Sequence, residues 1–327
     1  MNKTARWCVA CAALAVFAPA CAKKTVVIEN RYAKGEELTY RLLTKGSGTT
    51  SMSGLPGRPD AAEMPIGMEM ELLYRTTVKD VDARGAAEIE TSFERFSSVN
   101  ESGALKVRIE ADAKGARIIQ GETVTKEAPG LDGLKALFAR PTAFTMDKRG
   151  RVLSVARPGG VAAILPQMDL HAFLKHGQFL LPDGPVAAGN SWVEQRTLSL
   201  GEAAGGKAED AGTLVLDIRY TFVRLTTRGG RRCAEIALQG EMDAKDVAVS
   251  LPLTGPGGAG MKTVFDRLRQ RLNGTLFFDL GKGCAAELRV ETEQDVTMTM
   301  RLDDPEGEAR LSTVTKMKTD STLKLVE

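Results

Sequence analysis

The chain has 327 residues, of which 43% are hydrophobic and 5% aromatic, so it can bury the core of one large domain or of two medium ones. Its 44 basic and 42 acidic residues leave a formal net charge of +2. Because the two signs are interleaved, the sequence offers no basic field for nucleic acid or for anionic lipid headgroups, and it disfavours both as partners.

The first twenty residues have the composition of an export signal. Lys3 and Arg6 precede an almost wholly apolar run over residues 7–18, and small residues follow that run. About a dozen apolar residues are too few for a membrane-spanning helix, which needs roughly 20. The sequence therefore predicts a cleaved signal peptide over residues 1–20 and a mature chain that does not cross a bilayer.

Cys21 stands where two kinds of cleavage site overlap. The stretch APAC resembles a bacterial lipobox, with Ala18 in the place of the usual Leu. The resemblance implies a lipid on Cys21 that anchors the protein firmly to a membrane. Ala22, in place of Asp, implies the outer membrane, with the protein facing the periplasm. The alternative is ordinary signal cleavage, which leaves Cys21 a free thiol on a soluble periplasmic or secreted protein.

Period-two alternation of apolar and charged residues dominates the mature chain and predicts antiparallel sheets with one face in water. The alternating stretches are residues 68–78, 87–93, 105–109, 214–222, 234–242 and 296–302. Three stretches break the pattern and are predicted to be helices, namely residues 131–139, 160–176 and 261–272. The last of these places Val264, Phe265, Leu268 and Leu272 on one side of a helix. Residues 54–67, with three prolines, are predicted to form a long exposed loop.

The two halves of the chain resemble each other. YRTTVKDVDARGAAEIE from Tyr74 aligns with YTFVRLTTRGGRRCAEIA from Tyr220, and FTMDKRGRVLSV from Phe144 aligns with FFDLGKGCAAELRV from Phe277. The predicted fold is therefore a β-dominated α+β fold of two similar antiparallel-sheet units, each with a covering helix. The units are expected at residues 21–180 and 181–327, as one curved half-barrel or two separate sheets.

The stretch LPDGPVAAGNSW, residues 181–192, forms the predicted junction between these units. Trp192 opens the first strand of the second unit, and its large ring is expected in the core. With FTMDKRGRVLSV and a helix before it, this stretch resembles a family of uncharacterised bacterial secreted proteins and lipoproteins. Members share Leu-Pro and then Val-x-x-Gly-(Asp/Glu)-x-Trp, where this chain has Asn190 for the acid. The resemblance brings no catalytic residues.

Cys233 and Cys284 are the cysteines that follow Cys21. Exported proteins meet oxidising conditions, so the two are candidates for a disulfide, which would stabilise the fold by about 4 kcal/mol. The alternative is two separately buried thiols.

Motifs that suggest chemistry have simpler explanations. GPGGAG at residues 255–260 has dinucleotide-binding spacing, but prolines and alternating strands surround it, which favours a flexible connection. His171 and His176 are five residues apart, on different sides of a helix, so no metal site is predicted. The acidic pairs Glu69/Glu71 and Glu88/Glu90 lie on solvent faces of strands.

The methionines are the feature closest to a ligand site. Met68, Met70, Met298, Met300 and Met317 lie on apolar strand faces, where they fill a core or line an adaptable lipid cavity. We therefore expect a non-catalytic, lipid-anchored, periplasm-facing binding module without a cofactor; in one version of this hypothesis it carries a hydrophobic ligand. The alternative is an envelope scaffold that binds another protein. An enzyme is the third hypothesis and the one that the sequence favours least.

Overall fold

The computed structural model describes residues 24–54, 63–128, 131–156, 179–199, 213–251, 261–304 and 307–326. Several features expected from the sequence lie outside the described residues: the signal peptide 1–20, Cys21, the helix 160–176 with His171 and His176, the glycine-rich stretch 255–260 and most of the loop 54–67.

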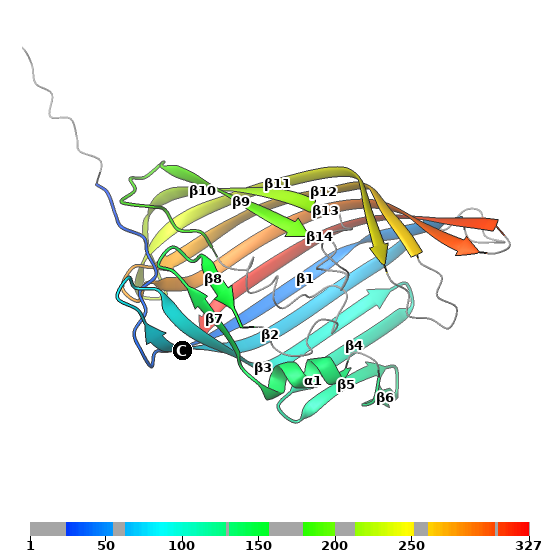
Figure 1. Cartoon of the computed structure of the whole chain (residues 1–327), viewed down its shortest axis with the longest axis horizontal. Helices are drawn as coiled ribbons and strands as arrows, with labels where there is room; N and C mark the ends of the chain where they lie inside the picture. The colour runs from blue at the N-terminus through cyan, green and yellow to red at the C-terminus, as the bar shows by residue number, and fades with distance from the viewer. Residues whose placement is uncertain are drawn as a thin grey trace, which may run out of the picture.

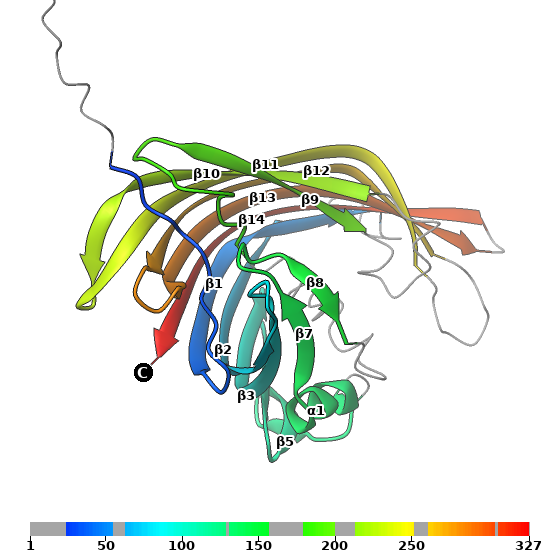
Figure 2. The ribbon, with the colours of Figure 1, turned by 60° about the vertical axis from the view of Figure 1, so that its left-hand side comes forward.

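Fourteen strands form one antiparallel sheet (Figure 1). They are β1 (Glu37–Ser53), β2 (Met64–Val81), β3 (Ala87–Ser102), β4 (Leu105–Asp112), β5 (Gly115–Gln120), β6 (Thr123–Thr125), β7 (Thr142–Met146), β8 (Val152–Val155), β9 (Ser191–Ser199), β10 (Thr213–Arg228), β11 (Arg231–Leu251), β12 (Met261–Asp279), β13 (Cys284–Asp304) and β14 (Gly307–Val326). The main path runs β6-β5-β4-β3-β2-β1-β14-β13-β12-β11-β10-β9, and β7 pairs with β3 and β8. The sheet curls into a trough with an inner and an outer face (Figure 2).

The expected pair of α+β units, each with its covering helix, is wrong. Strands β1 and β14 pair from Thr39 opposite Val326 to Ser53 opposite Ser312, so both halves of the chain share one sheet. The predicted helix at 131–139 is confirmed as α1 (Leu131–Ala139), which packs against β3, β4 and β5. It is the single helix among the described residues.

The helix expected at 261–272 is wrong because this stretch is the first part of β12. A register shift between Phe265 and Arg267 inserts one extra residue, and Asp246 of β11 takes a left-handed φ of 54° at the same place. The bulge moves the inner face from odd to even positions, so Phe265 and Leu268 both face inward. Two apolar residues three positions apart on one face are typical of a helix, but here the bulge in a strand produces the same spacing.

The two faces of the sheet differ in chemistry. The outer face carries cross-strand ion pairs, including Lys45–Glu69, Arg75–Glu94 and Arg271–Glu241. Exposed pairs of this kind add little stability, but they keep the surface soluble and favour one strand register. The inner face carries apolar side chains. A shift of one residue in strand register would turn this whole apolar set into water, so burial of the inner face fixes the register.

The internal similarity is real at some positions and displaced at others. Ala87 and Ile89 pair with Met146 and Phe144, as Ala234 and Ile236 pair with Phe278 and Leu276. Asp147 and Asp279 each accept two backbone N–H groups in the turn that follows.

The alignment of Tyr74 with Tyr220 is wrong by two residues. Val78 lies opposite Ile89 and Phe222 opposite Ile236, so Tyr220 occupies the place of Thr76. The turns after the two strands differ in length, and register shifts occur in both hairpins. An alignment carried across the turn therefore slips along the strand.

Two apolar cores lie on the inner face. One joins β2, β3 and β7 to α1, and the other joins β10, β11 and β12 to Ile28 and Leu181. The central strands β1, β14 and β13 lie between the two cores, and their inner side chains Leu42, Leu323 and Leu288 remain half-buried. The floor between the cores is therefore less completely covered than the cores themselves.

Candidate functional site

An N-terminal segment, residues 24–36, crosses one end of the trough, and we call it the strap. Val26 forms an antiparallel bridge with Val186, the Asn30 N–H donates to the Lys148 carbonyl at 2.8 Å, and the Arg31 N–H donates to the Gly283 carbonyl at 3.1 Å. Gly283 has a φ of +68°, and a Cβ there would lie 2.6 Å from the Arg31 nitrogen. The strap therefore ties the β7–β8 turn to the β12–β13 turn.

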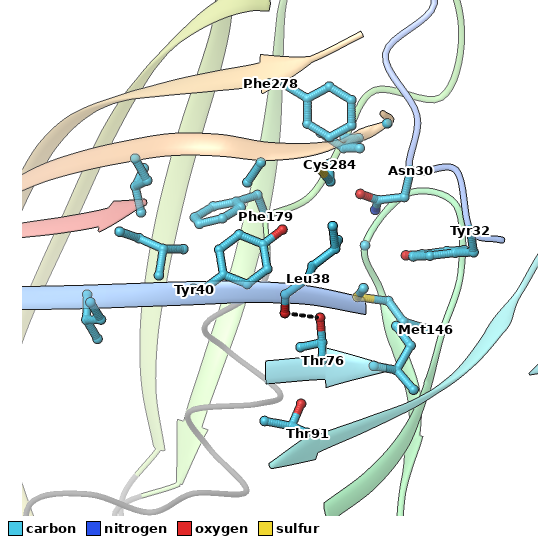
Figure 3. Close-up of a pocket in the computed structure, with 18 of the residues that line it drawn as sticks. Asn30, Tyr32, Leu38, Tyr40, Thr76, Thr91, Met146, Phe179, Phe278 and Cys284 are labelled. Carbon is cyan, nitrogen blue, oxygen red and sulfur yellow. Dashed lines mark hydrogen bonds between the residues drawn. The ribbon is translucent and has the colours of Figure 1, made fainter. Parts of the chain in front are cut away.

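A cavity of about 310 Å³ lies between the strap and the inner face of the sheet (Figure 3). Most of its lining is apolar, and includes Leu38, Leu42, Val78, Ile89, Phe144, Met146, Phe179, Leu181, Ile218, Leu238, Leu272, Phe278, Leu288, Val290 and Leu323. The lining also contains Arg31 and Arg196, and none of its described residues is acidic. This combination suits a hydrocarbon chain with a polar or anionic group at one end.

The chain has four tyrosines, and all four line this cavity: Tyr32, Tyr40, Tyr74 and Tyr220. The Tyr40 and Tyr74 rings stack at 5.6 Å, and burial is the main reason why the pKa of every tyrosine rises above its ordinary value of 10.0. The hydroxyls are neutral at physiological pH, as they would be with the ordinary pKa, and burial moves their ionisation further from that pH. Each tyrosine thus gives the wall an apolar ring with a polar tip.

A charged cluster lies beside Tyr220 on the edge strand β9. The Tyr220 hydroxyl donates to Glu194 Oε2 at 2.6 Å, and Arg196 donates to the same oxygen at 2.9 Å. Trp192 stacks on Tyr220 at 5.7 Å, and its indole N–H donates to the Leu180 carbonyl at 2.7 Å. Trp192 packs against the second core, as expected, and inward charges on β9 protect that sheet edge from pairing with other chains.

Thr91 supplies a buried polar group to which no described residue forms a hydrogen bond. Its side chain is 1% exposed, and its Oγ1 has no hydrogen-bond partner among the described residues. The side chain lies on the cavity wall below Thr76, whose own hydroxyl donates to the Leu38 carbonyl (Figure 3). A buried hydroxyl without a partner costs about 1–3 kcal/mol, so a ligand oxygen that bonds to it recovers stability.

The structure does not bring Cys233 and Cys284 together. Asp279 of β12 lies opposite Cys233 of β11 on one side and opposite Cys284 of β13 on the other. Two strand spacings separate the cysteine Cα atoms by roughly 10 Å, whereas a disulfide needs less than about 7 Å. Both are buried free thiols. Cys284 lies on the cavity wall, as does Tyr40.

We expect Cys284 to be a slow-reacting thiol in the folded protein. Burial raises the pKa of Cys284 to about 11, so at pH 8 only about one thiol in a thousand is ionised. Iodoacetamide at pH 8 should label the Cys284 peptide slowly in the folded chain and fast in denaturant without reductant. A disulfide-linked peptide pair containing Cys233 and Cys284 would contradict this arrangement.

The other candidates from the sequence fall outside the cavity. Met68, Met70, Met298, Met300 and Met317 are half-buried further along the strands, and none of them lines the cavity. Glu69, Glu71 and Glu90 form ion pairs with Lys45, Arg41 and Lys79. No group of three His, Cys, Asp or Glu side chains within the described ranges could hold a metal ion.

The sequence carried one unused signal of this site. Tyrosine is scarce, and two of the four tyrosines, Tyr74 and Tyr220, stand out as landmarks of the internal similarity. Their alternation phase places both on the inner face, but only the pairing of β1 with β2 brings Tyr40 beside Tyr74.

In the part of the chain that the structure describes, no helix is both long enough and apolar enough to cross a membrane.

No family model and no curated protein matches the chain. Among solved structures it is similar to lipovitellin, described for its lipid–protein interactions, at 13% identity and a TM-score of 0.44, over 91% of this chain and 26% of lipovitellin's. It is also similar to OpdQ of Pseudomonas aeruginosa at 10% identity and a TM-score of 0.22, over 89% of this chain and 100% of that one. A third similarity is to the β domain of the Bordetella autotransporter BrkA, at 10% identity and a TM-score of 0.19, over 88% and 99% of the two chains. At these TM-scores none of the three assigns a fold or a function to this chain.

Proposed function

We propose that the protein is a non-catalytic binding module of the cell envelope that holds the hydrocarbon chain of an amphipathic ligand in its cavity. The observation that carries the proposal is the gap between the two cores, lined by apolar side chains and by all four tyrosines. Each methylene group that leaves water for such a site contributes about 0.8 kcal/mol. No residue has a catalytic role in this proposal.

The polar groups of the cavity indicate how the ligand would lie. The strap contributes Asn30, Arg31 and Tyr32 at one end of the cavity, which is the end that can meet a polar or anionic headgroup. The hydrocarbon chain would then extend over Leu42 and Leu323 on the central strands. The lipid on Cys21 and the outer-membrane location remain predictions from the sequence, as does the kinship with the secreted family.

Native mass spectrometry tests the proposal directly. The chain is purified from the envelope without an N-terminal lipid, as the Cys21→Ser variant, and is transferred to the gas phase from a detergent-free buffer. We expect a bound species with the mass of a lipid or fatty acid, released on collisional activation. Repeated isolation of a clean apoprotein would overturn the proposal and favour the alternative, an envelope scaffold that binds a protein partner.

A further inference from the structure

The turns at the strap end of the sheet carry cationic side chains, although the whole chain is close to neutral. Strands β2, β7, β10 and β12 all end here, beside the strap and the C-terminal residue of β14, at the left of Figure 1. The exposed cations are Arg31, Arg84, Lys148, Arg151, Arg232 and Lys282, and we call this set the basic end. They come from five separate segments, so the sequence does not show them as a cluster.

The six side chains of the basic end form no ion pair with any described residue. The carboxylates nearby are already engaged. Asp80 pairs with Lys34 at 3.0 Å and Glu287 with Arg228 at 2.8 Å, and Asp183 pairs with Arg149.

Other carboxylates at this end lie within the turns. The Oδ1 atoms of Asp82, Asp147 and Asp279 accept backbone N–H groups, which leaves their negative charge in place. Of these three, Asp82 alone is exposed, and the strap residues Glu29 and Glu36 are half-buried. In these turns, the six exposed cations of the basic end therefore outnumber the exposed carboxylates that form no ion pair, of which Asp82 is one.

We infer that the basic end docks onto an anionic lipid surface. Basic side chains near a membrane are attracted by anionic headgroups and release counterions there. The strap begins three residues after Cys21, so a lipid on that cysteine would hold this end, rather than the far end of the trough, against the bilayer. Arg31 belongs both to the basic end and to the cavity wall, so the docked face would also place the cavity beside the headgroups.

Vesicle co-sedimentation at low ionic strength tests this inference with the Cys21→Ser chain, so that no anchor contributes. One vesicle set is phosphatidylcholine alone, and the other contains phosphatidylglycerol as about one third of the lipid. The test variant is Lys148→Gln/Arg151→Gln/Lys282→Gln. The matched control, Lys114→Gln/Lys245→Gln/Lys316→Gln, removes the same net charge from exposed sites elsewhere on the sheet. The unfolding midpoints of both variants are checked first.

The chain should bind the anionic vesicles and not the neutral ones, and added salt should release it. Each basic residue at such a surface changes the binding constant by about fivefold, so the test variant should bind roughly 100-fold more weakly and the control little differently from the parent. Equal binding by the two variants, equal binding to both vesicle sets, or no binding to anionic vesicles would overturn the inference. A variant with a filled cavity, Leu42→Trp, should still bind vesicles, which separates this surface from the proposed ligand site.

Discussion

Leu42→Trp is expected to remove the co-purifying ligand, whereas Leu43→Trp is expected to leave the protein loaded. Leu42 is half-buried on the inner face of β1 and lines the cavity. An indole ring there takes the space of several methylene groups of the ligand. Because each displaced methylene forfeits about 0.8 kcal/mol, the loss of three would weaken binding by roughly 50-fold.

Leu43 is the matched control because it is the next residue of the same strand and points to the other face. Its side chain is 39% exposed, so tryptophan at this position reaches solvent instead of the cavity. Both variants place the same residue in β1 and therefore share its strand preference. The bound fraction is measured by native mass spectrometry of the Cys21→Ser chain. If both variants kept the ligand, or both lost it, the ligand would not lie over Leu42.

Local pattern predicts the strands of this protein and fails where backbone geometry interrupts the pattern. The alternation at 68–78 and 214–222 is enough to assign β2 and β10 and their inner faces. At 261–272 one inserted residue changes the phase, so Phe265 and Leu268 lie on one face at a spacing typical of a helix. The amino-acid sequence does not mark the bulge, apart from Asp246. The left-handed φ of Asp246 cannot be inferred before the pairing of the strands is known.

Long-range pairing decides what local pattern cannot. The joining of the halves depends on the pairing of β1 with β14, which lie more than 250 residues apart in the sequence. It also depends on the absence of a side chain at close contacts, such as that of Gly48 with its partner Met317. The cavity depends on the same pairing, because it places Tyr40 and Leu323 on one floor. The basic end likewise needs the order of the strands, since a neutral net charge hides how charges are sorted in space. The tyrosine content was visible in the sequence, whereas the place where the tyrosines meet was not.

Gly48→Ala is expected to lower the free energy of unfolding by about 2–3 kcal/mol, the cost typical of an overpacked site. A Cβ on Gly48 would overlap the carbonyl oxygen of Lys316 and lie 2.9 Å from the Cα of Met317. Both are backbone atoms, so no side-chain rotation relieves the overlap and the strands themselves must move apart. Of the strand pairs that the structure describes, β1–β14 is the one that joins the two halves of the sheet.

Gly67→Ala on the neighbouring strand β2 provides the control, with an expected effect of the opposite sign. A Cβ there would meet Glu101 at 3.4 Å, an ordinary contact with a flexible side chain. Alanine also reduces the freedom of the unfolded chain, so this variant should gain up to about 1 kcal/mol. Urea unfolding of the two variants, followed by circular dichroism, measures both changes. Equal stability of Gly48→Ala and Gly67→Ala would mean that β1 does not approach the backbone of Lys316 this closely. The pairing of β1 with β14, on which the shared sheet and the cavity floor depend, would then be contradicted.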